Sequence, residues 1–279
     1  MKPDANTAVY CIIGNPVRHS LSPVMHNAAF EHLHINAVYV AFQPQSTQKA
    51  IEAIKTLGIQ GSSVTIPFKV ELVSLCDEVD NLALEIGSVN TLININGKVK
   101  GYNTDGNGLI KTLEHHAVDY VNKNVLIIGN GGSARAIAYT LAHHNAHITI
   151  CGRNETNVMH LVHDLHHHCT SVNSCLLHDL HPDTTLPFDI IINTTPVGMS
   201  PHVDTSPINE DCIHQPQIIV DIIYSPRETM LIKKARNKGC KTITGEYMLL
   251  YQACMQFELW TGKPAPFEIM YNALTQALQ

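Results

Sequence analysis

The stretch from 124 to 136, N-V-L-I-I-G-N-G-G-S-A-R-A, constrains the fold of this chain more than any other. Its apolar run at 125–128 has the length and β-branched character of a buried parallel strand. Three glycines follow, and a helical pattern of small residues begins directly after them. Such a turn can hold a pyrophosphate, because free backbone N–H groups and the positive end of the helix dipole point toward it. The alternative is a tight turn between strand and helix in any α/β domain.

A second predicted strand of this region, at 146–151, ends in Gly152-Arg153-Asn154. In sites for NAD, an acidic residue near this point hydrogen-bonds the ribose 2′-hydroxyl. None is present here, and Arg153 instead offers a planar guanidinium that suits a 2′-phosphate. The pattern therefore favours NADP over NAD. The alternative is an exposed arginine in a turn.

The alternation of strands and helices from 124 to 244 is typical of a doubly wound parallel sheet. We expect two further helices after it, at 246–260 and 264–278. The predicted fold class is α/β, with an N-terminal α/β substrate domain, a doubly wound Rossmann-type NADP domain, and C-terminal helices that return to the first domain. The expected boundaries are 1–103 with 246–279 for the substrate domain and 104–245 for the NADP domain.

Composition narrows the class of protein. The net charge of -6 with neutral histidines argues against a broad basic surface for nucleic acid. No segment approaches the ~20 apolar residues of a membrane span, and the N-terminal residues lack the apolar core of a signal peptide. The eight cysteines form no C-x-x-C pair, so we expect reduced thiols in a cytoplasmic protein rather than disulfides.

Histidine is frequent, with 18 residues that cluster at 115–116, 143–144 and 166–168 near the ends of predicted helices. Adjacent histidines on a helix point apart, so these clusters do not converge on one ion. We therefore expect no metal site.

Two serines lie between the first predicted strand, 8–13, and the helix that follows it. Ligands of open α/β sheets bind at such strand ends, and Ser20 and Ser22 beside a helix N-terminus can bind a small carboxylate. The alternative is that Ser22 only caps the helix, with Pro23 at the first helical position.

Three further polar residues occupy the ends of predicted elements. Lys69 follows the predicted strand 61–66 and opens a helix, where a lysine is unfavourable beside the positive helix end. Asn90 falls inside the predicted strand 88–95, an unusual position unless its amide binds something. Asp105 lies at the crossing between the two domains, where it either caps a helix or faces the cleft. For Lys69, the alternative is an ordinary surface lysine.

Seven short motifs follow one another along nearly the whole chain, and their order and spacing together resemble those of the shikimate dehydrogenase family. They are G-N-P-V-R-H-S-L-S-P-V-M-H-N (14–27), S-V-T-I-P-F-K (63–69), G-S-V-N-T-L (87–92), Y-N-T-D-G (102–106), G-N-G-G-S-A (129–134), N-T-T-P-V-G-M (193–199) and G-E-Y-M-L-L-Y-Q (245–252). The resemblance implies reversible, NADPH-dependent reduction of 3-dehydroshikimate to shikimate in aromatic amino-acid biosynthesis. It also implies a cleft between a substrate domain and an NADP domain.

The resemblance assigns roles to individual positions of this sequence. Lys69 and Asp105 would carry the proton chemistry. The implied substrate-binding residues are Ser20 and Ser22 for the carboxylate, Thr65, Asn90, Asp105 and Gln252 for the ring hydroxyls, and Tyr224 lining the site. The implied cofactor-binding residues are Gly129, Asn130, Gly131, Gly132, Ser133, Gly152, Arg153 and Asn154, with Ile222, Gly245 and Met248 beside the nicotinamide.

Two departures from the family pattern stand out. Ser63 occupies the position where the family usually has asparagine, which leaves its role open, and the usual N-R-T after the second nucleotide strand is G-R-N at 152–154. The alternatives are a quinate/shikimate dehydrogenase of broader specificity, a non-catalytic shikimate-binding regulator, and an unrelated NADP domain joined to a binding module. We expect a monomer or a homodimer that binds small molecules only.

Overall fold

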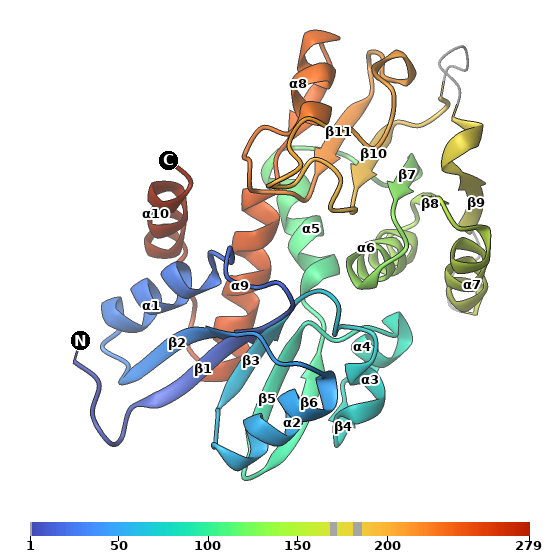
Figure 1. The fold of residues 1–279 in the computed structure, drawn as a ribbon. Coiled ribbons are helices and arrows are strands. Elements are labelled where there is room, and N and C mark those ends of the chain that lie inside the picture. Colours follow the sequence, from blue (N-terminus) through green and yellow to red (C-terminus); the bar gives the residue numbers. More distant parts are fainter. Residues whose placement is uncertain (1, 168–171, 181–185) are drawn as a thin grey trace. The chain divides into compact units, whose positions relative to one another are not determined.

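The computed structural model describes residues 2–167, 172–180 and 186–279. The chain divides into two compact units, the first made of Met1–Asp105 with Leu250–Gln279 and the second of Gly106–Leu249. Each unit contains one six-stranded sheet with helices packed on it (Figure 1). The chain passes from one unit to the other within two helices, α5 (Asp105–His115) and α9 (Glu246–Thr261).

The sheet of the first unit is mixed and has the order β2-β1-β3-β5-β6-β4. Strands β1, β2 and β3 are parallel, whereas β5 and β6 form an antiparallel hairpin beside β3. The strands are β1 (Ala8–Ile13), β2 (Ala37–Phe42), β3 (Gly61–Val64), β4 (Glu78–Val79), β5 (Thr91–Ile95) and β6 (Lys98–Tyr102). The helices are α1 (Ser22–His32), α2 (Thr47–Thr56), α3 (Leu72–Leu75), α4 (Asn81–Ile86) and α10 (Phe267–Ala277).

Both faces of β1 are buried, which explains its continuous apolar sequence. On one face, Cys11 and Ile13 pack in a core with Ile51 and Ile54 of α2. On the other face, the Tyr10 ring lies 5.2 Å from Phe30 and 5.3 Å from Trp260, as centroid distances. The first unit thus has an aliphatic core on one side of the sheet and an aromatic core on the other.

The sheet of the second unit is entirely parallel, with the order β12-β11-β10-β7-β8-β9. This is the doubly wound order: β8 and β9 extend the sheet on one side of β7, and β10, β11 and β12 extend it on the other, so the switch point lies between β7 and β10. The strands are β7 (Asn124–Ile128), β8 (His147–Gly152), β9 (Val172–Leu176), β10 (Ile190–Asn193), β11 (Ile218–Asp221) and β12 (Lys241–Ile243). The helices are α6 (Gly132–His143), α7 (Glu155–His166) and α8 (Met230–Asn237). The expected fold class is confirmed.

Three local expectations were wrong. Ser22 does not cap α1: it is the first helical residue, and Leu21 holds the cap position. Lys69 does not open a helix, because its carbonyl accepts the Val89 N–H at 2.8 Å and residues 66–71 form a turn before the short α3. Asn90 precedes β5 instead of lying inside it.

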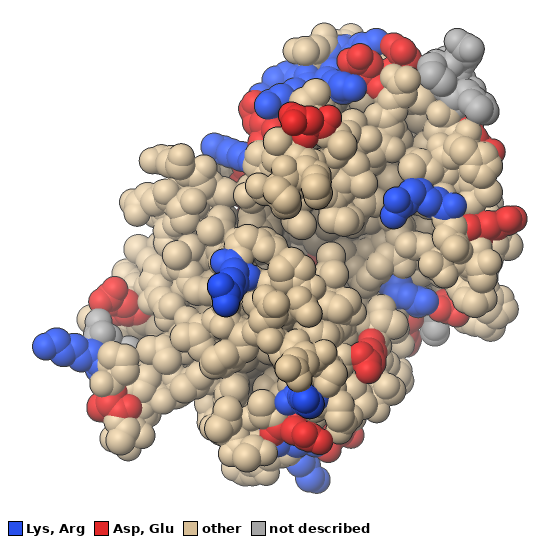
Figure 2. Space-filling view, viewed as in Figure 1, with Lys and Arg blue, Asp and Glu red and all other residues tan. Residues whose placement is uncertain are grey.

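On the face that Figure 2 shows, acidic and basic side chains are interspersed, without an extended basic area. No helix among the described residues has the length and hydropathy of a membrane-spanning segment. The described cysteines are free thiols, and Cys169 and His168 lie outside the described residues.

Candidate functional site

The sheet of the first unit brings polar residues that are distant in sequence together at one end of its strands, which is called the edge of the sheet below. Strand β6 is antiparallel to β5, which is antiparallel to β3, so β3 and β6 run in the same direction. Their carboxyl ends therefore meet the amino end of β5 at one edge. Lys69 follows β3, Asn90 immediately precedes β5, and Asp105 follows β6.

Lys69 and Asp105 form a buried ion pair at this edge. The Lys69 Nζ lies 2.6 Å from Asp105 Oδ2, and the two side chains are only 12% and 5% exposed. Asn103 positions the carboxylate, because its Oδ1 accepts the Asp105 N–H at 3.0 Å while its Nδ2 donates to the Ser88 carbonyl. A buried ammonium with a carboxylate partner is a group that can donate a proton in a defined direction.

The Asn90 amide binds the other carboxylate oxygen, which explains an asparagine at this position. Its Nδ2 donates to Asp105 Oδ1 at 2.7 Å and to Thr104 Oγ1 at 2.9 Å, and its Oδ1 accepts the Thr104 N–H at 2.9 Å. Both oxygens of Asp105 are thereby held. A charge-assisted hydrogen bond on each oxygen leaves the carboxylate little freedom to rotate.

The other candidate substrate residues of the first unit lie at elements that end at the same edge. Strands β1 and β3 are parallel, so Ser20 and Ser22, which follow β1, are on the side of Thr65, which follows β3. Ser20 Oγ accepts the Ser22 N–H at 3.3 Å, and Ser22 itself is buried. Gln252 of α9 is nearly buried, and its carbonyl accepts Thr104 Oγ1 at 3.2 Å.

In the second unit, the glycine turn follows the central strand β7. Gly129 has φ +121°, and a Cβ there would lie 2.3 Å from Thr194 Oγ1. Gly131 holds the cap position of α6 and, having no side chain, does not itself cap the first-turn N–H groups. A Cβ on Gly131 would meet only open space. Gly132 and Ser133 begin the helix itself. The turn fits an anion held by backbone N–H groups at the switch point of the sheet.

The end of β8 lies close to this turn. A Cβ on Gly152 would lie 3.7 Å from Asn130 Nδ2, which places the two candidate stretches side by side. Asn154 caps α7 by accepting the Asn157 N–H at 3.0 Å. Arg153 between them is exposed. Its guanidinium fits a phosphate ligand.

The carboxyl ends of β11 and β12 form another part of the second unit. A Cβ on Gly245 would lie 2.3 Å from the Ile222 carbonyl oxygen, so the backbones at these two positions approach closely. Tyr224 follows in the same loop, and Met248 is buried in the first turns of α9. Tyr224 is the one candidate substrate residue that belongs to the second unit.

Sequence reasoning missed a buried polar cluster beneath these loops. Asp221 is fully buried and accepts Asn193 Nδ2 at 3.1 Å, the Ile223 N–H at 3.1 Å and Thr229 Oγ1 at 2.7 Å. Burial raises the pKa of the Asp221 carboxyl to about 6, although these hydrogen bonds oppose the shift. The signal in the sequence was a charged residue that ends an apolar strand, and Asn193 in the N-T-T-P-V-G-M motif.

Comparisons with known proteins point to one family for nearly the whole length of the chain. Three family models match: the shikimate dehydrogenase substrate binding domain at 12–92, shikimate/quinate 5-dehydrogenase at 112–242, and the shikimate 5′-dehydrogenase C-terminal domain at 245–275. A curated relative from Methanococcus vannielii, a shikimate dehydrogenase (NADP(+)), is 42% identical over 283 residues, which cover 99% of each protein. The chain belongs to the shikimate dehydrogenase family.

Solved structures of the family have the same fold. A shikimate dehydrogenase in complex with NADP+ superposes with a TM-score of 0.92 at 39% identity, covering 100% of this chain and 98% of that one. The Thermus thermophilus enzyme in complex with NADP(H) and shikimate has a TM-score of 0.87 at 27% identity, covering 98% and 100%.

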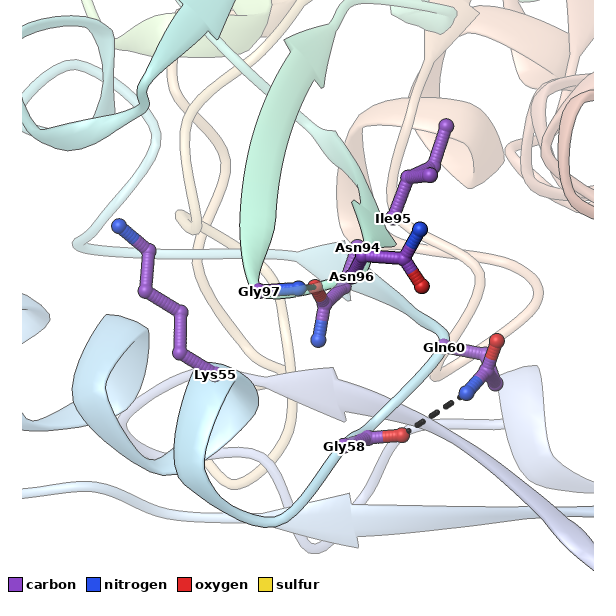
Figure 3. Close-up of a pocket in the computed structure, with 7 residues that line it drawn as sticks. All are labelled: Lys55, Gly58, Gln60, Asn94, Ile95, Asn96 and Gly97. Atoms are coloured by element: carbon purple, nitrogen blue, oxygen red, sulfur yellow. Dashed lines mark hydrogen bonds between the residues drawn. The ribbon is translucent and has the colours of Figure 1, made fainter.

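A surface hollow of about 340 Å³ lies elsewhere on the first unit (Figure 3). It is lined by Lys55, Gly58, Gln60, Asn94, Ile95, Asn96 and Gly97. These residues surround the turn of the β5–β6 hairpin, so the hollow lies at the opposite end of these strands from Asn90 and Asp105. Lys55 is already paired with Asp77 at 2.8 Å, and the remaining lining carries no acid, base or nucleophile for catalysis.

Proposed function

We propose that this chain reduces 3-dehydroshikimate reversibly to shikimate with NADPH, in the pathway of aromatic amino-acid biosynthesis. Family membership over the whole chain supports the reaction. The single observation that carries the chemistry is the buried Lys69–Asp105 ion pair with its 2.6 Å separation. A keto reduction needs a proton donor beside the carbonyl oxygen, and this pair is one.

The nicotinamide supplies the hydride when the cofactor is bound. In the proposed mechanism, the Lys69 ammonium lies beside the substrate oxygen, stabilises its growing negative charge and gives it a proton. Asp105 holds the lysine through Oδ2 while Asn90 holds Oδ1. In the direction of oxidation, Lys69 takes the proton back, and Asp105 stabilises the ammonium that results.

Substrate binding is assigned to groups around this pair. The hydroxyls of Ser20 and Ser22, beside the start of α1, bind the carboxylate. Thr65, Asn90, Asp105 and Gln252 bind the ring hydroxyls, and Tyr224 lines the site. Every one of these except Tyr224 belongs to the first unit.

Cofactor binding is assigned to the second unit. The turn from Gly129 to Ser133 holds the pyrophosphate with its backbone N–H groups, and Gly152, Arg153 and Asn154 hold the adenosine 2′-phosphate. Ile222, Gly245 and Met248 lie beside the nicotinamide. In this proposal 1–103 with 246–279 is the substrate domain, 104–245 is the NADP domain, and the enzyme is a cytoplasmic monomer or homodimer.

The test is a spectrophotometric assay at 340 nm with shikimate and quinate, each with NADP+ and with NAD+. We expect turnover of shikimate with NADP+ to exceed the other three combinations. Comparable turnover of quinate would instead support the broader quinate/shikimate activity. Binding of shikimate without any turnover would support a regulator and overturn the proposed reaction.

A further inference from the structure

A chain of buried polar side chains leads from the aromatic core of the first unit to Asn90. The Tyr39 hydroxyl donates to Ser63 Oγ at 2.6 Å, and Ser63 Oγ donates to Gln256 Oε1 at 2.6 Å. Gln256 Nε2 donates to Thr91 Oγ1 at 3.0 Å and to the Asn90 carbonyl at 3.1 Å. Thr91 Oγ1 then donates to Asn90 Oδ1 at 2.7 Å. All of these side chains are at most 4% exposed.

The direction of every hydrogen bond in this chain follows from its two ends. At one end the Asn90 carbonyl can only accept, so the Gln256 NH2 group must face it and Oε1 must face Ser63. At the other end the Thr104 N–H can only donate, so Asn90 Oδ1 faces it and the Asn90 NH2 group faces Asp105. Thr91 Oγ1 accepts a hydrogen bond from Gln256 Nε2, so its own hydroxyl donates to Asn90 Oδ1.

The aromatic core maintains this direction. Burial raises the pKa of the Tyr39 hydroxyl well above its usual value, so Tyr39 stays a donor. The ring of His26 stacks on Tyr39 at 4.5 Å, and burial lowers the pKa of His26 to about 3, which keeps it neutral.

We propose that Gln256 and Thr91, supported by Ser63, are positioning residues that hold the Asn90 amide so that its NH2 group faces the catalytic carboxylate of Asp105. A rotated amide would place its oxygen against Asp105 Oδ1 and lose the bonds to Thr91 and Thr104. This series of hydrogen bonds thus links α9, near the C-terminus, to the Lys69–Asp105 pair. The inference rests on the proposed function, since it deepens the role of that pair.

The same geometry accounts for Ser63, which departs from the family pattern. Ser63 is 4% exposed, and its hydroxyl is hydrogen-bonded on both sides, to Tyr39 and to Gln256. In this proposal Ser63 contacts other side chains of the protein and does not contact the substrate. Its contribution to turnover passes through Gln256.

Three variants test the proposal as a matched set. Thr91→Val removes the donated hydrogen bond but keeps the branched shape, Thr91→Ser keeps the hydroxyl, and Thr112→Val is a control. Thr112 is equally buried, and its hydroxyl donates to the Gly108 carbonyl of its own helix. One hydrogen bond to the Asn90 amide corresponds to ~10-fold in rate. We expect kcat with shikimate and NADP+ to fall ~10-fold in Thr91→Val and by less than ~3-fold in Thr91→Ser.

The readouts separate positioning from stability. KM for NADP+ and the thermal unfolding midpoint are measured for each variant alongside kcat. We expect Thr112→Val to lower the midpoint comparably without lowering kcat. A kcat of Thr91→Val within twofold of the parent, or an equal loss in Thr91→Ser, would overturn the proposal.

Ser63→Ala gives the same test if Thr91→Val does not fold, because it interrupts the chain one residue further from Asn90. A kcat reduced ~3-fold or more at unchanged KM for NADP+ supports the proposal, and an unchanged kcat rejects it.

NMR separates failure of this inference from failure of the proposed function. The side-chain amide signal of Asn90 is followed in protein labelled with ¹⁵N-asparagine and assigned with Asn90→Asp. If the parent turns over no shikimate, the proposed function fails. The inference is then judged by whether this signal moves in Thr91→Val and stays in Thr91→Ser; a signal that is the same in both would reject it.

Discussion

The two units present polar groups to their candidate ligands by different means. In the second unit, β7 is apolar from Val125 to Ile128, and the groups that would hold an anion are backbone N–H groups exposed by glycines. In the first unit, the polar groups are side chains held by other side chains, such as Asn90 between Asp105 and Thr104. Backbone presentation depends on a short local motif, whereas side-chain presentation depends on partners distant in sequence.

This contrast predicts that a substitution in the first unit acts on turnover and one in the second acts on cofactor binding. The largest effect is expected for Lys69→Ala, which removes the proton donor. General acid catalysis contributes ~10²–10⁴-fold, so kcat should fall by that factor while the Kd for NADPH, measured by fluorescence titration, stays within twofold. Turnover near that of the parent would remove Lys69 from the proposed mechanism.

Arg153→Ala tests the second unit at its side-chain contact. Losing charge-assisted hydrogen bonds to a 2′-phosphate should reduce the preference for NADP+ over NAD+ by ~10–100-fold in kcat/KM, with the value for NAD+ nearly unchanged. Arg135→Ala is the matched control, because Arg135 is already paired with Asp164 at 2.6 Å. An unchanged cofactor preference would reject the 2′-phosphate role.

Two properties of the glycine turn can be tested separately: the positive φ that Gly129 requires, and the open space that Gly131 leaves for a ligand. Gly129→Ala should lower the free energy of unfolding by about 1–3 kcal/mol, because φ is +121° and the new Cβ meets Thr194 Oγ1. In Gly131→Ala, the new Cβ meets no protein atom and φ is -82°, so stability should fall little. The Cβ would instead occupy the space in front of the turn where the pyrophosphate is proposed to bind, so NADPH binding should weaken. Urea unfolding and NADPH titration of both variants check this pair. Equal loss of stability in both would contradict the distinction.

Asp221 is an exception in the second unit, because it is a charged side chain buried among hydrogen-bonding partners at the end of an apolar strand. The pH dependence of stability tests whether it titrates. Its folded pKa of about 6 lies above the unfolded value of about 3.9, so the folded state binds the extra proton between these values. The contribution to stability is present below pH 4 and is lost as the pH rises through 6. Asp221→Asn should therefore gain about 1–2 kcal/mol relative to the parent between pH 4.5 and pH 7 in urea unfolding. A pH-independent difference would show that Asp221 does not titrate there.

The sequence predicted more of the second unit than of the first. The apolar strands from 124 to 244, the glycine turn and Arg153 are local patterns, and the parallel sheet places each where the pattern predicted. In the first unit, the predicted cap at Ser22 and the predicted helix at Lys69 were wrong. Hydrogen bonds from residues distant in sequence, such as Val89 N–H to the Lys69 carbonyl, override the local preference there.

By itself, the sequence determined the α/β class, the order of strands and helices, the family, and which residue types are available for proton transfer and anion binding. Hydrophobic periodicity and glycine turns act over a few residues, so they can be read directly along the chain. Only the tertiary structure decided that Asn90 binds Asp105 and that Gln256 reaches back across the chain to Ser63 and Thr91. Those contacts depend on the register of β3, β5 and α9 packing together, and no local pattern encodes that register.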